Sequence, residues 1–132
     1  MSMTFEIEKN NPLEIEKFSH IEKKLKYLRS YGPKSFAILS KEDGSYIQVA
    51  GGGVTCVVEI RDANKNIQER AYLLQSRVPF SGEQTLVFGG GKIIMEPNEI
   101  LFIEDVIEVF KSFFYKKPFP KNIYWKKLDF KN

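Results

Sequence analysis

The segment that decides the fold is residues 46–61, which read YIQVAGGGVTCVVEIR. Both halves are rich in apolar and β-branched residues, and a triple glycine separates them. This pattern predicts a β-hairpin over residues 46–50 and 54–61, because glycine supplies the positive φ that a tight turn needs. The triplet leads into a strand, whereas a phosphate-binding loop leads into a helix N-terminus. We therefore interpret it as a turn and not as a nucleotide site.

Extended segments lie on both sides of this hairpin. The connections between them are short, which favours antiparallel pairing because parallel strands need long crossovers. A second triple glycine, at 89–91, also joins two strands. Residues 4–8 alternate in the manner of a short edge strand, and residues 123–128 have the pattern of a last strand or a packed arm. The middle strands are expected at 35–40, 46–50, 54–61, 69–78, 83–88 and 92–96.

Two amphipathic helices are predicted, over residues 12–31 and 98–116. Asn11 is a suitable N-cap with Pro12 at the first helical position, and Gly32-Pro33 is a stop signal. The chain is thus expected to form a single α+β domain over 1–132, a five- to six-stranded mainly antiparallel sheet with both helices packed on one face. Its predicted core contains Phe18, Ile21, Leu25, Leu28, Val57, Ile60, Phe110 and Phe114.

Composition argues against catalysis, a cofactor or a metal site. Cys56 is the only cysteine and His20 the only histidine, so neither a disulfide, a Cys-ligated zinc site nor a His pair can form within the chain. Cys56 lies in an apolar run and is expected in the core. We find no secretory signal and no apolar run of membrane-spanning length, so we expect a cytoplasmic protein that does not enter a membrane.

The charge distribution keeps a nucleic-acid partner open as the alternative function. The formal net charge is +3, and residues 111–132 carry seven lysines against one Asp. Lysines interleaved with aromatic residues suit single-stranded nucleic acid, because bases stack on rings and phosphates meet cations. The alternative is that these rings pack under the sheet while the lysines face solvent. The basic aromatic tail comprises Lys116, Lys117, Phe119, Lys121, Tyr124, Trp125, Lys126 and Lys127.

Polar and aromatic side chains of the middle strands and the tail are the candidate binding surface. Glu59 interrupts an apolar strand, so we expect it to pair with Arg61, Arg70 or Arg77. Tyr46 and Gln48 share one strand face by the two-residue period, as do Glu59 and Arg61. Aromatic and arginine side chains most often carry interface energy. The candidate partner-binding residues are Tyr46, Gln48, Glu59, Arg61, Tyr72, Tyr124 and Trp125.

The segments 46–53 and 56–61 resemble a hairpin of the small bacterial immunity proteins that accompany polymorphic or contact-dependent growth-inhibition toxins. The 106–114 stretch, followed by Pro118 and Trp125, is similar to the C-terminal half of that group. The resemblance implies a cytoplasmic, non-enzymatic protein that binds a toxin domain and neutralises it. The net positive charge argues against an anionic surface that mimics nucleic acid. A third reading is an enzyme or small-ligand domain with its site on the open sheet face.

Overall fold

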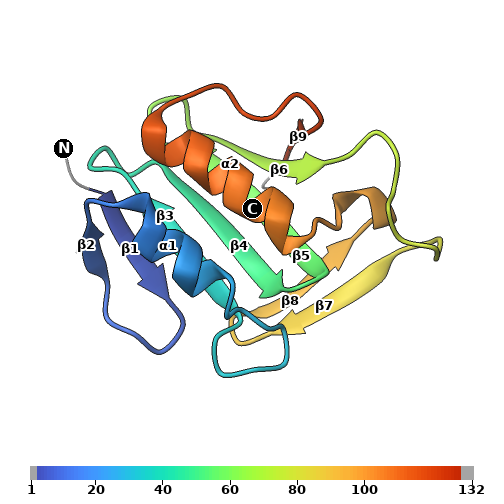
Figure 1. Cartoon of the computed structure of the whole chain (residues 1–132). Coiled ribbons are helices and arrows are strands. Elements are labelled where there is room, and N and C mark those ends of the chain that lie inside the picture. Colours follow the sequence, from blue (N-terminus) through green and yellow to red (C-terminus); the bar gives the residue numbers. More distant parts are fainter. Residues whose placement is uncertain (1–2, 129–132) are drawn as a thin grey trace.

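A computed structural model describes residues 3–128 and shows an α+β protein with a mainly antiparallel sheet (Figure 1). Seven strands form one sheet in the order β2-β1-β3-β4-β5-β6-β9, and β7 and β8 form a separate two-stranded hairpin. The strand count therefore exceeds the five or six expected. Asp129 and Lys131, which count among the charges of residues 111–132, lie outside the described residues. The strands are β1 Met3–Ile7, β2 Leu13–Ile15, β3 Phe36–Ser40, β4 Tyr46–Gly52, β5 Thr55–Asp62, β6 Ile67–Tyr72, β7 Gln84–Phe88, β8 Gly91–Met95 and β9 Tyr124–Lys127.

Both glycine triplets lie at hairpin turns, as predicted. Gly52 pairs with Thr55 at the end of β4–β5, and Phe88 pairs with Gly91 at the end of β7–β8. Gly51 has a φ of +95°, which L side chains rarely adopt. A Cβ on Gly52 would overlap the backbone of Leu28, so only glycine allows the segment after the first helix to approach the sheet this closely.

The first helix is much shorter than predicted, because α1 spans only Phe18–Leu25. Asn11 and Pro12 do not begin a helix, since residues 13–15 pair with β1 as the sheet's outermost strand. Consequently β1 is not the edge strand that its alternation suggested. Beyond Leu25, the N–H of Leu28 bonds to the carbonyl of Leu25 in a tighter turn, and the helix ends well before Gly32.

The second predicted helix is interrupted near its start. A 3-10 turn, η1, covers Pro97–Glu99, and the α-helix α2 spans Ile103–Tyr115. Between them Leu101 exchanges backbone hydrogen bonds with Cys56, at 2.9 and 2.8 Å, which holds this stretch extended. The side chain of Asp105 then accepts a hydrogen bond from the Phe102 N–H and caps the first turn of α2.

Both helices lie on one face of the seven-stranded sheet (Figure 1). Their apolar side chains pack on alternate strand residues such as Leu39, Ile47 and Val58 to form the main core. Six of the eight predicted core residues are buried, but Ile60 and Phe114 are only half-buried. Phe114 lies at the rim, where its ring meets Phe18 at 5.8 Å. Within residues 3–128, neither helix has the length and apolar character needed to cross a membrane.

The hairpin β7–β8 covers part of the opposite face, here called the open face. Ala50 and Val57 are cross-strand neighbours there, and they form a second, smaller core with Leu86 and Met95 of the hairpin. The remainder of the open face carries polar and aromatic side chains. The fold thus places the main core on one side of the sheet and a partly uncovered polar surface on the other.

Candidate functional site

Six of the seven candidate binding residues lie on the open face. Tyr46 pairs across strands with Arg61, and Gln48 pairs with Glu59. At the far edge of the sheet, Tyr72 pairs with Tyr124, and their ring centroids are 5.7 Å apart. These residues come from β4, β5, β6 and β9, so strand pairing alone brings together side chains that are distant in the sequence.

Trp125 differs from its neighbour Tyr124 because successive strand residues point to opposite faces. Trp125 pairs with the buried Ala71 and packs against the main core. Its ring lies 4.9 Å from that of Phe119. The structure therefore places Trp125 on the helix side of the sheet, away from the other six candidates.

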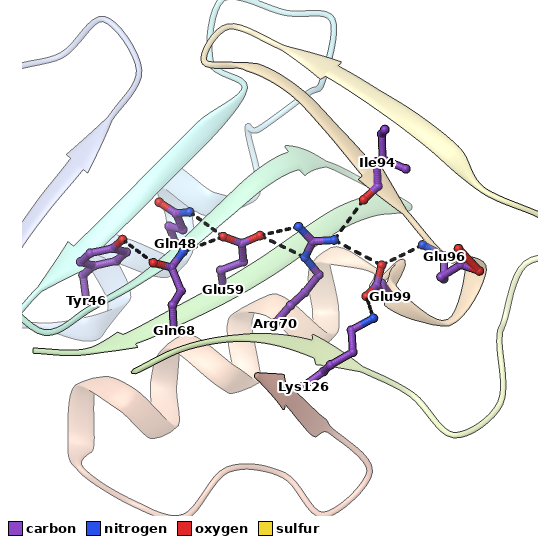
Figure 2. A network of polar contacts seen from close by, with 9 residues as sticks. All are labelled: Tyr46, Gln48, Glu59, Gln68, Arg70, Ile94, Glu96, Glu99 and Lys126. Carbon is purple, nitrogen blue, oxygen red and sulfur yellow. Dashed lines mark hydrogen bonds and ion pairs between the residues drawn. The ribbon is translucent and has the colours of Figure 1, made fainter. Parts of the chain in front are cut away.

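Glu59 is the centre of a polar network on the open face (Figure 2). It is 7% exposed, and its carboxylate accepts four hydrogen bonds. Gln48 and Gln68 donate to Oε1 at 3.2 and 2.9 Å, while Arg70 donates Nε and Nη2 to Oε2 at 3.0 and 2.8 Å. Tyr46 donates its hydroxyl to Gln68, which extends the network toward β4. Glu59 is thus tied to its two neighbouring strands, β4 and β6, by donors from the protein itself.

Arg70 connects this network to the hairpin and to η1. Its Nη1 donates to the carbonyl of Ile94 in β8 at 3.0 Å and to Glu99 Oε1 at 3.3 Å. Glu99 also accepts the Glu96 N–H at 2.7 Å and pairs with the ammonium of Lys126 from β9. Burial by itself raises the pKa of Glu99, but the hydrogen bonds from Lys126 and Glu96 and the charge of Arg70 outweigh it and hold this pKa below its usual value.

The network balances its own charges. Glu59 and Glu99 contribute two negative charges, and Arg70 and Lys126 contribute two positive ones. Each buried carboxylate is engaged by a cation, which is the condition under which charged groups tolerate burial. The arrangement therefore fixes the side chains of β4, β5 and β6 relative to one another beneath the open face.

A cleft of about 290 Å³ opens beside the network, between the open face and the hairpin. Gln48 and Glu59 form its polar floor. Its apolar walls come from the sheet and from the hairpin, and the rings of Phe36 and Phe88 meet edge to face with centroids 6.0 Å apart. The lining residues are Phe36, Ile38, Gln48, Val49, Ala50, Val57, Glu59, Phe88, Gly90 and Ile93.

Several functional residues were not identified in the sequence. Gln68 and Glu99 belong to the network but do not stand out by composition or spacing, and Lys126 stood out only as part of the basic tail. Arg70 was one of three possible partners for Glu59, and the geometry selects it. Arg61 instead donates to Asn66, and Arg77 pairs with Asp105. The sequence did indicate that a partner for Glu59 must exist, because a charged residue inside an apolar strand needs one on a neighbouring strand.

The two residues singled out for their chemistry lie apart from this site. Cys56 is fully buried on the helix side of β5, as expected, and burial raises the pKa of its thiol to about 12. His20 is exposed on α1. In the part of the chain that the structure describes, no three His, Cys, Asp or Glu side chains converge as a metal ion would require.

Part of the basic aromatic tail packs against the folded core. Phe119 and Trp125 pack together against the core, and Lys126 is paired with Glu99. Of the three tail rings, Tyr124 is the one that is exposed, and it is paired with Tyr72. This arrangement leaves less of the tail for stacking against bases than its sequence suggested.

Comparison with known proteins adds no family assignment. Neither a scan against protein-family models nor a search of curated proteins gives a match. The case for a function therefore depends on the residues and their geometry.

Proposed function

We propose that this protein is a cytoplasmic, non-enzymatic immunity protein whose open face binds and neutralises a cognate bacterial toxin domain. The observation that carries the proposal is the gathering of Tyr46, Gln48, Arg61, Tyr72 and Tyr124 around the Glu59–Arg70 network on a face that the helices leave uncovered. The sequence resemblance to immunity proteins of toxin systems supports the same function.

Preorganisation is the physical reason that this face suits tight binding. A flexible surface loses side-chain entropy when it binds, at about 0.5–1.5 kcal/mol for each immobilised side chain. Here Gln48, Gln68 and Arg70 are already fixed by Glu59. The half-buried Tyr46 and Arg61 at its rim supply the large, partly apolar contacts that dominate protein interfaces.

The same geometry favours a protein partner over nucleic acid. Binding to nucleic acid depends on unpaired cations that neutralise phosphates. On the open face Arg70 and Lys126 are already matched by Glu59 and Glu99, whereas Arg61 keeps its charge because its partner Asn66 is neutral. An inhibitor also needs only a stable, complementary surface and no reactive group, which agrees with a network in which every charge is engaged.

Calorimetry against the toxin domain encoded beside this gene tests the proposal. We expect nanomolar binding that changes little between low and moderate salt, and weak binding of mixed oligonucleotides. Tyr46→Ala and Arg61→Ala should each weaken toxin binding at least about tenfold, or about 1.4 kcal/mol. Tyr27→Ala is the matched control, because Tyr27 is 69% exposed and follows α1 on the helix side.

A growth assay provides the functional readout. Cells that express the toxin domain should survive when they also express the wild-type chain or Tyr27→Ala, and should be less protected by Arg61→Ala. Tight, salt-sensitive oligonucleotide binding without any response to the toxin domain would rule out the proposed function.

A further inference from the structure

The basic side chains of the open face lie on one half of it only, where Glu59 and Glu99 pair with Arg70 and Lys126. Strand register places Glu6 of β1 and Glu14 of β2 on its first half, whereas Arg61, Arg70 and Lys126 lie on the half formed by β5, β6 and β9. Among the described residues, no lysine or arginine occupies an open-face position on β1 to β4. The cleft beneath the hairpin spans β3, β4 and the start of β5, next to this acidic half.

The mouth of the cleft lies close to two carboxylates. Glu6 is the cross-strand neighbour of Ile38, which lines the cleft. Glu8 lies against the hairpin turn, where a Cβ on Gly89 would overlap its carboxylate. Ser35 holds Glu8 in place, since its N–H donates to Glu8 Oε1 at 2.7 Å and its hydroxyl accepts the Gly89 N–H at 2.8 Å. Two acidic groups, Glu6 and Glu8, therefore lie near the mouth, and Lys9 and Lys34 lie near Glu8.

Three of the neighbouring cations are engaged elsewhere or lie on the far side of the hairpin. Arg70 is engaged by Glu59 and Glu99 beyond the cleft floor. Lys34 donates to the backbone carbonyl of Glu8 and to Asn10. Lys92 pairs with Val87 on the outer side of the hairpin, the side opposite the cleft-lining Ile93.

We infer that the cleft receives an arginine side chain of the protein partner, an inference that rests on the proposed function. The volume of about 290 Å³ lies at the lower end of ligand sites, which fits one long side chain. The aliphatic stem would lie against Ile38 and Ile93. The guanidinium would lie between aromatic rings and acidic groups, where its planar cation stacks and donates hydrogen bonds.

A titration with n-butylguanidinium tests the cleft without the toxin domain. The readout is the methyl NMR signals of Ile38 and Ile93, with Ile107 in the main core as the internal reference. We expect saturable shifts at the two cleft methyls only, and binding at least threefold tighter than that of n-pentanol or pentanoate. Equal binding of n-pentanol, tighter binding of pentanoate, or no shift in the cleft would overturn the inference.

Three variants assign the binding to the acidic mouth. Glu6→Gln should weaken n-butylguanidinium binding at least threefold, whereas Glu16→Gln, also at an exposed acid, should leave it unchanged. Ile38→Lys places a cation beside Glu6 and should abolish probe binding. If Ile38→Lys lowers the melting temperature markedly, Glu6→Gln still decides the question, because Glu6 is exposed and its replacement removes no core contact.

Calorimetry with the toxin domain separates this inference from the proposed function. We expect Glu6→Gln and Ile38→Lys to weaken toxin binding at least threefold and tenfold. Wild-type affinity in both variants would overturn the arginine site while leaving the proposed function standing. Probe binding in the cleft with no toxin binding by the wild-type chain would reject the proposed function but support a site for a basic side chain.

Discussion

Arg70 holds Glu59 by donating both Nε and Nη2 to the same carboxylate oxygen, at 3.0 and 2.8 Å. Both side chains are largely buried. Removing one partner of a buried pair leaves the other charge unmatched, which costs about 3–5 kcal/mol. We expect Arg70→Met to lower the free energy of unfolding by that amount in urea titrations, against less than about 1 kcal/mol for Arg61→Ala.

The double variant Glu59→Leu with Arg70→Met tests the cause of this loss. Replacing both charges by apolar groups removes the unmatched carboxylate, so the double variant should be more stable than Arg70→Met alone by about 1 kcal/mol or more. If the double variant is no more stable than Arg70→Met, the loss in Arg70→Met comes mainly from its contacts with the Ile94 carbonyl and Glu99.

Glu99 gives the protein a distinct response to acid. Its pKa lies below the ordinary 4.5 in the folded protein, so the unfolded chain takes up a proton at higher pH than the folded one. The stability that Glu99 contributes is therefore complete above about pH 5 and is lost as the pH falls through the folded pKa. We expect the free energy of unfolding to fall less steeply from about pH 5 to about pH 3 in Glu99→Gln than in the wild type. Glu83→Gln, at an exposed loop position, should retain the wild-type slope.

Cys56 should be chemically silent until the protein opens. Burial raises the pKa of its thiol to about 12, and the nearby Asp105 and Glu104 add to the effect. Since the thiolate is the reactive form, we expect Ellman's reagent at pH 8 to label the native protein at least about a hundredfold more slowly than the guanidinium-unfolded chain. Rapid labelling of the native protein would show that the segment around the Cys56–Leu101 bridge opens readily.

The central hairpin and the hairpin role of both glycine triplets were predictable because they depend on local signals. Alternating apolar residues and glycine turns specify a strand and its reversal within a few residues. The first helix was predicted correctly but over too long a range, 12–31, because the capping pattern at Asn11 and Pro12 is compatible with a helix or a strand. Residues 13–15 instead pair with β1, and this pairing delays the start of the helix to Phe18.

The candidate site was partly predictable for the same reason. The two-residue period placed Tyr46 with Gln48 and Glu59 with Arg61, but it could not say which face the helices would cover. Trp125 was grouped with Tyr124 by composition, whereas strand alternation separates them. Glu99 and Lys126 required the register of β6 with β9 and the position of η1, neither of which has a local signature.

Phe110 and Phe114 lie on the same helix but should differ in their contribution to stability. Phe110 is fully buried, so Phe110→Ala should cost about 3–5 kcal/mol by thermal or urea unfolding. Phe114 is half-buried at the rim beside Phe18, so its surroundings can relax and Phe114→Ala should cost about 1–2 kcal/mol. A loss below about 1 kcal/mol at Phe110 would contradict the packing of α2 on the sheet.

Tyr124 and Trp125 are adjacent in β9 but should affect different measurements. Tyr124 is 38% exposed on the open face, so we expect Tyr124→Ala to weaken toxin binding at least about tenfold while changing stability by less than about 1 kcal/mol. Trp125 packs against Phe119 and the core, so Trp125→Ala should cost about 2–3 kcal/mol of stability. Trp125→Phe should retain most of it, because the buried indole N–H has no hydrogen-bond partner within residues 3–128. Affinity and unfolding should be measured on the same preparations. If Trp125→Phe remains folded but loses as much toxin affinity as Tyr124→Ala, the assignment of binding to the open face is contradicted.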